Sequence, residues 1–168
     1  MKASGLTDVI VELLKDANRR RVKTSVENIT ADQDKKLQAI ASKAGEIFEC
    51  PISQVTLLGD QFQTFLVSQG ADLSKAPTET SFCAHTLGAE DPVFIVCDAT
   101  KDERFKSNPF VTGDFHIRFY IGCPIILEDQ RIGTICLYDF TAREGITREQ
   151  SRLLVDLAWD ASLVLSRG

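Results

Sequence analysis

Residues 119–138 have the sequence FYIGCPIILEDQRIGTICLY, in which two apolar stretches, 119–127 and 132–138, flank a short polar turn. Both stretches are rich in β-branched and aromatic residues, so they are predicted to form an antiparallel pair of strands. Pro124 cannot donate a hydrogen bond to a neighbouring strand, which places it at a sheet edge or at a bulge. The pair is therefore the expected centre of a β-sheet.

A second hairpin is predicted upstream, where residues 53–58 and 61–68 flank the tight-turn signal Gly59-Asp60. Side chains alternate along a strand, which assigns the second stretch to two faces. One face is predicted to carry Phe62, Thr64, Leu66 and Ser68, and the other Gln61, Gln63, Phe65 and Val67. Because neither face is purely polar, helices are expected to cover at least one side of the sheet. Residues 93–97 form one more apolar run of strand length.

Three amphipathic helices and one short helix are predicted around this sheet. The first begins near Leu6 and ends in a basic turn, the second starts at a capping box at 30–33, and the last starts at a capping box at 147–150. Residues 81–87 are expected to form the short helix. The last helix carries a second apolar row, Val155, Trp159 and Leu163, which needs a partner. That partner is either the first helix or the terminal helices of a second chain.

Composition sets the class of protein. The chain has 168 residues, of which 43% are hydrophobic and 26% charged, as expected for one globular domain. Its net charge of −5 excludes a broad phosphate-binding surface, so no nucleic-acid partner is expected. No membrane-spanning or secretory segment is recognised, and a cytoplasmic location is predicted. Five cysteines, an odd number, lie mostly among apolar neighbours and are predicted to be buried free thiols.

Residues 98–118 connect the strand at 93–97 to the hairpin at 119–138. They combine charged residues with scattered aromatic and apolar ones, Phe105, Phe110, Val111 and Phe115. A connection of this length that carries its own aromatic residues is typical of a packed functional lid. Arg118, at the end of the lid, is expected to pair with an acid such as Asp98 or to bind an anionic ligand.

Five strings occur in a fixed order along the chain: SFCAHTL at 81–87, DATKDERF at 98–105, NPFVTG at 108–113, IRFYIGCP at 117–124 and IGTIC at 132–136. Together they resemble the GAF domains attached to bacterial histidine kinases and diguanylate cyclases, over residues 32–165. The resemblance implies an α+β, GAF/PAS-like fold: a central antiparallel sheet, N- and C-terminal helices packed on one face, and a lid of short helices and loops on the other. Residues 1–30 would be an amphipathic helix and connector, and residues 31–168 the GAF domain.

The resemblance also implies a sensory or regulatory module rather than an enzyme. Such a module binds a small molecule between sheet and lid, forms a homodimer through its terminal helices, or does both, and acts on a signalling output domain or partner protein. No cofactor and no metal are expected. The candidate ligand-binding residues are Phe82, His85, Asp98, Phe105, Phe110, Val111, His116, Arg118, Tyr120 and Cys136.

Several sharper functions of this family fit the sequence poorly. Members that bind cyclic nucleotides resemble one another through an Asn-Lys pair, whereas Asn108 is followed by proline. Cys83 and His85 lie two residues apart on a helix and point in different directions, which argues against bilin attachment and against zinc. Haem ligation by His85 or His116 has no support in the sequence.

Two alternatives stay open. Free methionine-R-sulfoxide reductases are small GAF proteins whose catalytic cysteine follows a His-Ile pair, but here His116-Ile117 is followed by Arg118. A reductase would require Cys83 or Cys97 to react instead. The other alternative is a purely structural dimerisation domain, with no ligand and with its cavity filled by its own side chains.

Overall fold

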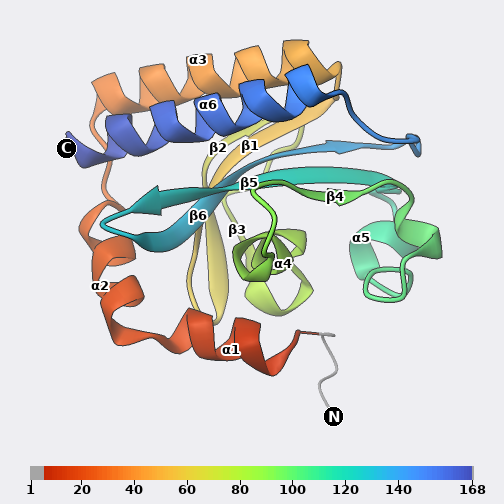
Figure 1. The fold of residues 1–168 in the computed structure, drawn as a ribbon, viewed down its shortest axis with the longest axis horizontal. Coiled ribbons are helices and arrows are strands. Elements are labelled where there is room, and N and C mark those ends of the chain that lie inside the picture. The colour runs from red at the N-terminus through yellow and green to blue at the C-terminus, as the bar shows by residue number, and fades with distance from the viewer. Residues whose placement is uncertain (1–5, 168) are drawn as a thin grey trace.

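A computed structural model describes residues 6–167 and shows a six-stranded antiparallel sheet with helices on both faces (Figure 1). The strand order across the sheet is β3-β2-β1-β6-β5-β4. The strands are β1 (Ile52–Leu58), β2 (Phe62–Gln69), β3 (Lys75–Pro77), β4 (Phe94–Val96), β5 (Phe119–Leu127) and β6 (Gln130–Asp139). The helices are α1 (Asp8–Lys15), α2 (Ala17–Ser25), α3 (Ala31–Phe48), α4 (Phe82–Gly88), α5 (Pro109–Thr112) and α6 (Arg148–Ser166), with 3-10 turns η1 (Thr78–Thr80) and η2 (Ala99–Lys101).

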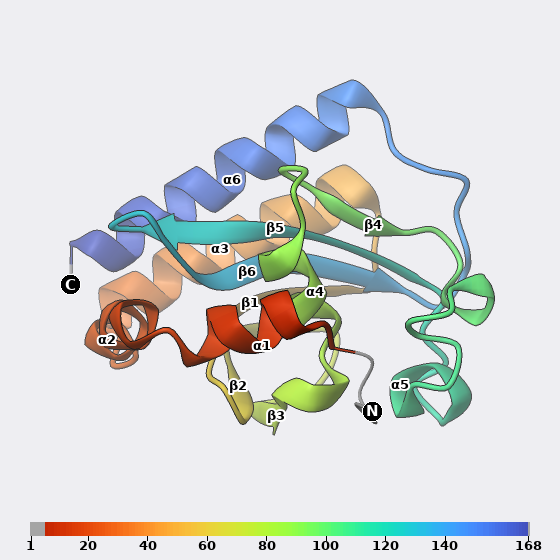
Figure 2. The same ribbon diagram turned by 60° about the horizontal axis from the view of Figure 1, so that its bottom comes forward.

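Both long helices begin at the predicted capping boxes. The Thr30 hydroxyl accepts a hydrogen bond from the Gln33 backbone N–H at 3.1 Å, and the Gln33 amide oxygen accepts one from the Thr30 N–H at 2.8 Å. Thr147 and Gln150 form the same pair at the start of α6. α3 and α6 lie side by side on one face of the sheet, and α1, α4 and α5 lie on the other (Figures 1 and 2). The predicted fold class is confirmed.

Successive side chains of the central strand β6 point to opposite faces of the sheet and so belong to two different layers of the core. In β6, Ile135 and Leu137 pack toward α3 and α6, while Cys136 and Tyr138 face α4. Both faces are covered, which explains why the sequence of this hairpin is apolar throughout. At Pro124, β5 pairs with β6 alone, because β4 ends its pairing at residues 120–122. Pro124 therefore lies where the strand has only one neighbour, as predicted.

The predicted assignment of β2 side chains to the two faces of the sheet is wrong for Val67 and Ser68. The register of β1 and β2 shifts between Val55 and Thr56, so that Val55 pairs with Val67 and Thr56 with Phe65. This bulge places Phe65 on the α4 side and Val67 on the α3 side. Without a bulge, two residues that are two positions apart in a strand would lie on the same face. Ser68, assigned to the other face, lies on the α4 side and bonds Gln54.

The N-terminal segment also differs from expectation. It forms two helices rather than one, because Asp16 leaves the helical conformation (φ −57°, ψ 124°) and caps α2 through the Arg19 N–H. α1 packs against α4, where Ile10 fills the space beside Gly88. The interpretation that this helix covers the Val155 row of α6 is wrong, since it lies on the opposite face of the sheet (Figure 2).

Arg19 anchors this N-terminal segment. Its side chain is fully buried and donates hydrogen bonds to four backbone carbonyls, those of Leu13 (3.1 Å), Leu14 (3.3 Å), Leu58 (2.7 Å) and Arg131 (3.2 Å). The guanidinium therefore ties α1 to the turns of both hairpins. The predicted boundary between residues 30 and 31 coincides with the start of α3, although Ile10 and Leu14 share a core with α4.

Two remaining expectations concern membranes and thiols. No helix within residues 6–167 is long and apolar enough to cross a membrane. Cys83, Cys123 and Cys136 are buried, whereas Cys50 and Cys97 are partly exposed.

Candidate functional site

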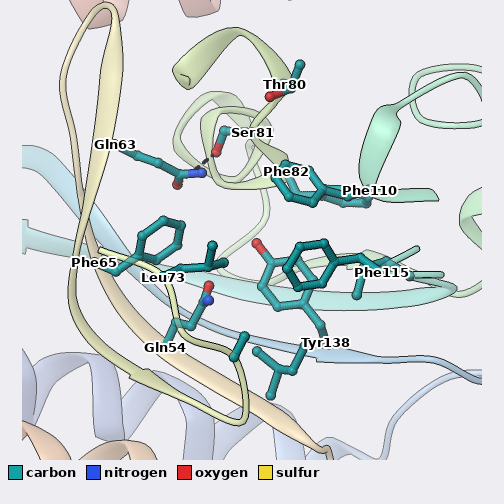
Figure 3. Close-up of a pocket in the computed structure, with 13 residues that line it drawn as sticks. Gln54, Gln63, Phe65, Leu73, Thr80, Ser81, Phe82, Phe110, Phe115 and Tyr138 are labelled. Carbon is teal, nitrogen blue, oxygen red and sulfur yellow. Dashed lines mark hydrogen bonds between the residues drawn. The ribbon is translucent and has the colours of Figure 1, made fainter. Parts of the chain in front are cut away.

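A small cavity lies between the sheet and the lid. It encloses about 30 Å³, room for about two water molecules. Its walls are mainly aromatic and aliphatic, with the polar groups of two glutamines (Figure 3). The lining residues are Ile52, Gln54, Gln63, Phe65, Ala71, Leu73, Thr80, Ser81, Phe82, Phe110, Phe115, Ile117 and Tyr138. None of these residues is charged, and Phe115 is 37% exposed, so the cavity borders on solvent.

The polar groups of the cavity are held by the start of α4 and by β2. The Ser81 hydroxyl accepts from the Ala84 N–H at 3.3 Å, which caps α4, and donates to the Gln63 amide oxygen at 3.0 Å. The Gln54 amide donates to the Ser68 hydroxyl at 3.1 Å. Both glutamines are thus oriented by protein partners, and each presents an amide to the cavity.

The lid is a packed segment. Asn108 fixes it to the turn η1, just before α4: its amide nitrogen donates to the Thr80 carbonyl at 2.9 Å, and its amide oxygen accepts from the Phe110 N–H at 2.8 Å. At its two ends, the Ala99 N–H bonds the Arg118 carbonyl at 2.7 Å and the Arg118 N–H bonds the Asp139 carbonyl at 3.0 Å. Buried lid side chains, among them Phe105, join the core under α4. The prediction of a packed lid is confirmed.

Behind the cavity, α4 and the central strands enclose a cluster of thiols and hydroxyls. The Cys83 and Cys136 sulfurs are 3.5 Å apart, and the Tyr120 hydroxyl donates to the Cys83 sulfur at 3.5 Å. The Tyr138 hydroxyl lies 3.7 Å from the same sulfur, and the Thr86 and Tyr120 hydroxyls are 2.6 Å apart. Among the described residues, no buried side-chain nitrogen or oxygen lacks a hydrogen-bond partner.

His85 lies on the other side of α4, in an aromatic setting. Its ring meets that of Phe105 edge to face, with centroids 4.8 Å apart, and stacks near Phe94 at 6.2 Å. The guanidinium of Arg104, held by a bidentate ion pair with Asp102, covers the same two phenylalanine rings. Burial, with the positive charge of Arg104, lowers the pKa of His85 to about 4. The imidazole is therefore neutral at physiological pH.

The candidate residues from sequence fall into two groups. Seven of them gather around α4: two line the cavity, Phe82 and Phe110, and five lie in the core next to it, His85, Phe105, Val111, Tyr120 and Cys136. The other three, Asp98, His116 and Arg118, lie at the outer end of the lid and do not line the cavity.

The expected ion pair between Arg118 and Asp98 is not formed within the described part of the chain. Arg118 instead donates to the carbonyls of Val111 (2.9 Å) and Ile117 (3.0 Å) and lies 3.0 Å from the His116 Nδ1. The Asp98 carboxylate accepts from the Thr100 hydroxyl at 2.6 Å and from its N–H at 3.0 Å. The Asp98 carboxylate and the Arg118 guanidinium therefore both bond groups that are close to them in the chain.

Both glutamines of the cavity were absent from the residues predicted from the sequence. The sequence could have indicated both, because Gln63 shares a strand face with Phe65 and Gln54 lies within the apolar stretch 53–58. Each is an amide at a position that faces the core. Tyr138 was missed because it ends an apolar strand. No group of three or more His, Cys, Asp or Glu suited to a metal occurs among residues 6–167.

Known proteins match this chain in sequence and in fold. The family described as the GAF domain matches residues 32–165. A cyclic di-GMP phosphodiesterase of Pseudomonas aeruginosa is 35% identical over 135 residues, which are 80% of this chain but only 22% of that protein. The chain thus spans about a fifth of the length of this relative.

Solved structures show the same fold at low sequence identity. The GAF domain of an Acinetobacter phosphoenolpyruvate-protein phosphotransferase superposes with a TM-score of 0.67 at 15% identity, covering 96% of this chain and 95% of the other. A type II free methionine-R-sulfoxide reductase from Thermoplasma acidophilum superposes with a TM-score of 0.65 at 12% identity, covering 80% and 93%. At these identities the likeness concerns the fold alone.

Proposed function

Because this chain belongs to the GAF family, we propose that it is a sensory module that binds a small, uncharged, planar molecule between the sheet and the lid. The observation that carries the proposal is the lining of the cavity: five aromatic rings and two glutamine amides, without a charged side chain. Such a mixture of apolar wall and few oriented polar groups is typical of small-molecule sites. An anion would lose its hydration there without gaining a cationic partner.

The cavity as it stands holds far less than a ligand, so binding requires the lid to move. We expect Phe110 and Phe115 to move, because both line the cavity from the lid and Phe115 is exposed. Phe110 lies in the short helix α5 and Phe115 follows it, with their ring centroids 5.3 Å apart. In the view of Figure 3 they stand across the cavity from Gln63 and Phe65. A ligand that binds the open arrangement better would shift the population toward it and change how the lid meets the sheet.

The first test uses two probes of nearly equal shape, benzamide and benzoate, measured by saturation-transfer NMR. Benzamide is expected to bind, and benzoate to bind at least about tenfold more weakly, because the cavity offers no cation. The variant Ala71→Trp, which places a large ring at the half-buried cavity edge, is expected to abolish the benzamide signal. Native mass spectrometry of the purified protein checks for a retained molecule.

The matched control is Ala142→Trp, which adds the same ring at an exposed position outside the cavity. It should leave benzamide binding unchanged. If neither probe binds the wild-type protein and no molecule is retained, the cavity is a packed core, and the purely structural dimerisation domain replaces the sensor.

We propose in addition that the protein forms a homodimer through α6 and passes its signal along that helix to a signalling domain or partner protein. Trp159 is 66% exposed on α6, flanked one turn away by Val155 and Leu163, both 38% exposed. The neighbouring groove contains Ile126, which is 44% exposed. A contiguous apolar patch of this kind favours association with another surface.

Trp159→Glu is therefore expected to weaken self-association at least about tenfold, because a buried interface tryptophan commonly contributes a large share of the binding energy. Sedimentation velocity across a concentration series measures the change. The control is Val9→Glu, which makes the same kind of substitution at a 69% exposed position on α1. A wild-type protein that stays monomeric at millimolar concentration contradicts the proposed dimer.

We propose that the protein is not an enzyme. The position after His116-Ile117, where the reductases carry their cysteine, is Arg118, which has no thiol to attack a sulfoxide. Cys97 is partly exposed, and its thiol bonds the Glu144 carbonyl at 3.6 Å, outside the cavity. Turnover of free methionine sulfoxide that disappears on replacement of Cys83 or Cys97 would instead establish the reductase.

A further inference from the structure

Cys83 and Cys136 form a pair of adjacent thiols in the core under α4. They are brought together from α4 and β6, with their sulfurs 3.5 Å apart and both side chains fully buried. Three tyrosine or threonine hydroxyls surround them, those of Tyr120, Tyr138 and Thr134. Of the five cysteines, only these two contact each other in the described structure.

From this geometry we propose that Cys83 and Cys136 are a peroxide-reactive pair that closes to an intramolecular disulfide. This site lies beside the ligand cavity, and the proposal does not rest on the proposed ligand. Its oxidant is a small hydroperoxide, with hydrogen peroxide as the simplest member.

The cavity is the approach that we assign to the oxidant, which reaches the thiols when the side chains between them and the cavity move aside. Gln54 and Tyr138 line the cavity on one side and contact the thiols on the other: the Cys136 thiol bonds the Gln54 amide oxygen at 3.8 Å, and the Tyr138 hydroxyl lies 3.7 Å from the Cys83 sulfur. One layer of side chains therefore separates the thiols from a space of about 30 Å³ that borders on solvent. A molecule scarcely larger than water fits that space.

The surroundings assign different roles to the two sulfurs. Burial raises the pKa of Cys83, but hydrogen bonds from Cys136, Thr134, Tyr120 and Tyr138 lower it by more. Burial and the contact with Cys83 both raise the pKa of Cys136. The thiolate is the reactive form of cysteine, so Cys83 is the sulfur that attacks and Cys136 the one that resolves.

The reaction proceeds in two balanced steps. The Cys83 thiol first ionises; its thiolate attacks one peroxide oxygen, the O–O bond breaks and the sulfenic acid forms, while the hydroxide released takes up the proton that the thiol gave up and leaves as water. The Cys136 sulfur then attacks the sulfenic sulfur, the S–O bond breaks, and the departing hydroxide leaves as a second water with the Cys136 proton. Two thiols lose two electrons, and one hydrogen peroxide becomes two waters.

The test is intact-mass and peptide mass spectrometry of the full chain after treatment with hydrogen peroxide and alkylation under denaturing conditions. The expected result is a loss of about 2 Da, a cross-linked peptide pair containing Cys83 and Cys136, and recovery of both thiols on reduction with a dithiol. Cys123 is the internal reference: it is also buried, its pKa is raised to about 12 by burial, and it has no thiol neighbour in the described structure.

Variants separate the roles. Cys136→Ser is expected to stop at a dimedone-reactive sulfenic acid on Cys83, Cys83→Ser to prevent any reaction at Cys136, and Cys123→Ser to leave the cross-link intact. Both thiols remaining fully alkylatable in the treated wild-type protein, or Cys123 oxidising as readily as Cys83, would overturn the proposal. The wild-type measurement needs no variant, and its outcome does not depend on whether benzamide binds.

Discussion

Replacing Arg19 by methionine is expected to lower the free energy of unfolding by about 3 to 5 kcal/mol. Methionine keeps much of the buried volume but removes all five donors of the guanidinium, so four backbone carbonyls lose the hydrogen bond that Arg19 donates, two of them in buried positions. Urea unfolding followed by circular dichroism measures the loss. Hydrogen exchange of the amides of α1 should show the earliest loss of protection, since Arg19 holds that helix to the two hairpins.

Arg20→Met is the matched control, because Arg20 is the next residue in α2 and is exposed. It should change stability by no more than about 0.5 kcal/mol. Arg19→Lys keeps the positive charge but not the planar fork of donors. Its free energy of unfolding should therefore fall by most of the amount expected for Arg19→Met. Equal stability of the Arg19 and Arg20 variants would contradict the role assigned to this side chain.

Acidification from about pH 7 to about pH 4.5 is expected to cost the wild-type protein about 2 kcal/mol through His85 alone. The pKa of His85 is about 4 in the folded protein, against an ordinary value of 6.5. Between these values the unfolded chain binds a proton that the folded protein excludes. Stability from the neutral His85 is therefore fully present above pH 6.5 and declines as the pH falls toward 4, below which the loss levels off.

Urea unfolding at a series of pH values checks this prediction with the variant His85→Gln, which cannot titrate. The variant should lose about 2 kcal/mol less than the wild type over the same range. The control is His116→Gln, because His116 is exposed and lies outside the aromatic setting of His85. Parallel pH profiles for the wild type and the His85 variant would show that the imidazole is not held neutral. Asp98 and Asp102 have pKa values below their ordinary range and titrate under more acidic conditions.

These two residues connect stability to the proposed sensor. Arg19 fixes α1 over α4, and His85 sits on the face of α4 that the lid covers through Phe105. Both therefore act on the helix whose N-terminal turn forms the cavity wall. A change at either site is expected to alter how firmly the lid side of the sheet is closed.

The elements of this fold were predictable wherever their signal is local. The capping boxes at Thr30 and Thr147 mark helix starts, because the side chain and backbone groups involved are only three residues apart. The paired apolar stretches predicted both hairpins for the same reason. Of the candidate site residues, Phe82 and Phe110 line the cavity, and their role in binding a ligand stays a prediction.

The remaining differences have non-local causes. The bulge at Val55 and Thr56 depends on how β1 fits both β2 and β6, and it moves Phe65 and Val67 to opposite faces in a way that alternation does not reveal. The break at Asp16 lets α2 leave the axis of α1, and so places α1 over α4. Arg118 was expected to form an ion pair with Asp98, but its guanidinium donates instead to the carbonyls of Val111 and Ile117.

By itself the sequence determined the two central hairpins, the two long helices and the short helix that lies between the hairpins in chain order, because capping, turns and alternation act between residues close in the chain, and five ordered strings carried the resemblance to the GAF family. Only the tertiary structure decided which face α1 covers, how small the cavity is, and that Cys83 meets Cys136 across 53 residues of chain. Such contacts depend on strand register and on how α4 crosses β6. A shift of one residue in either would exchange the side chains that face each other.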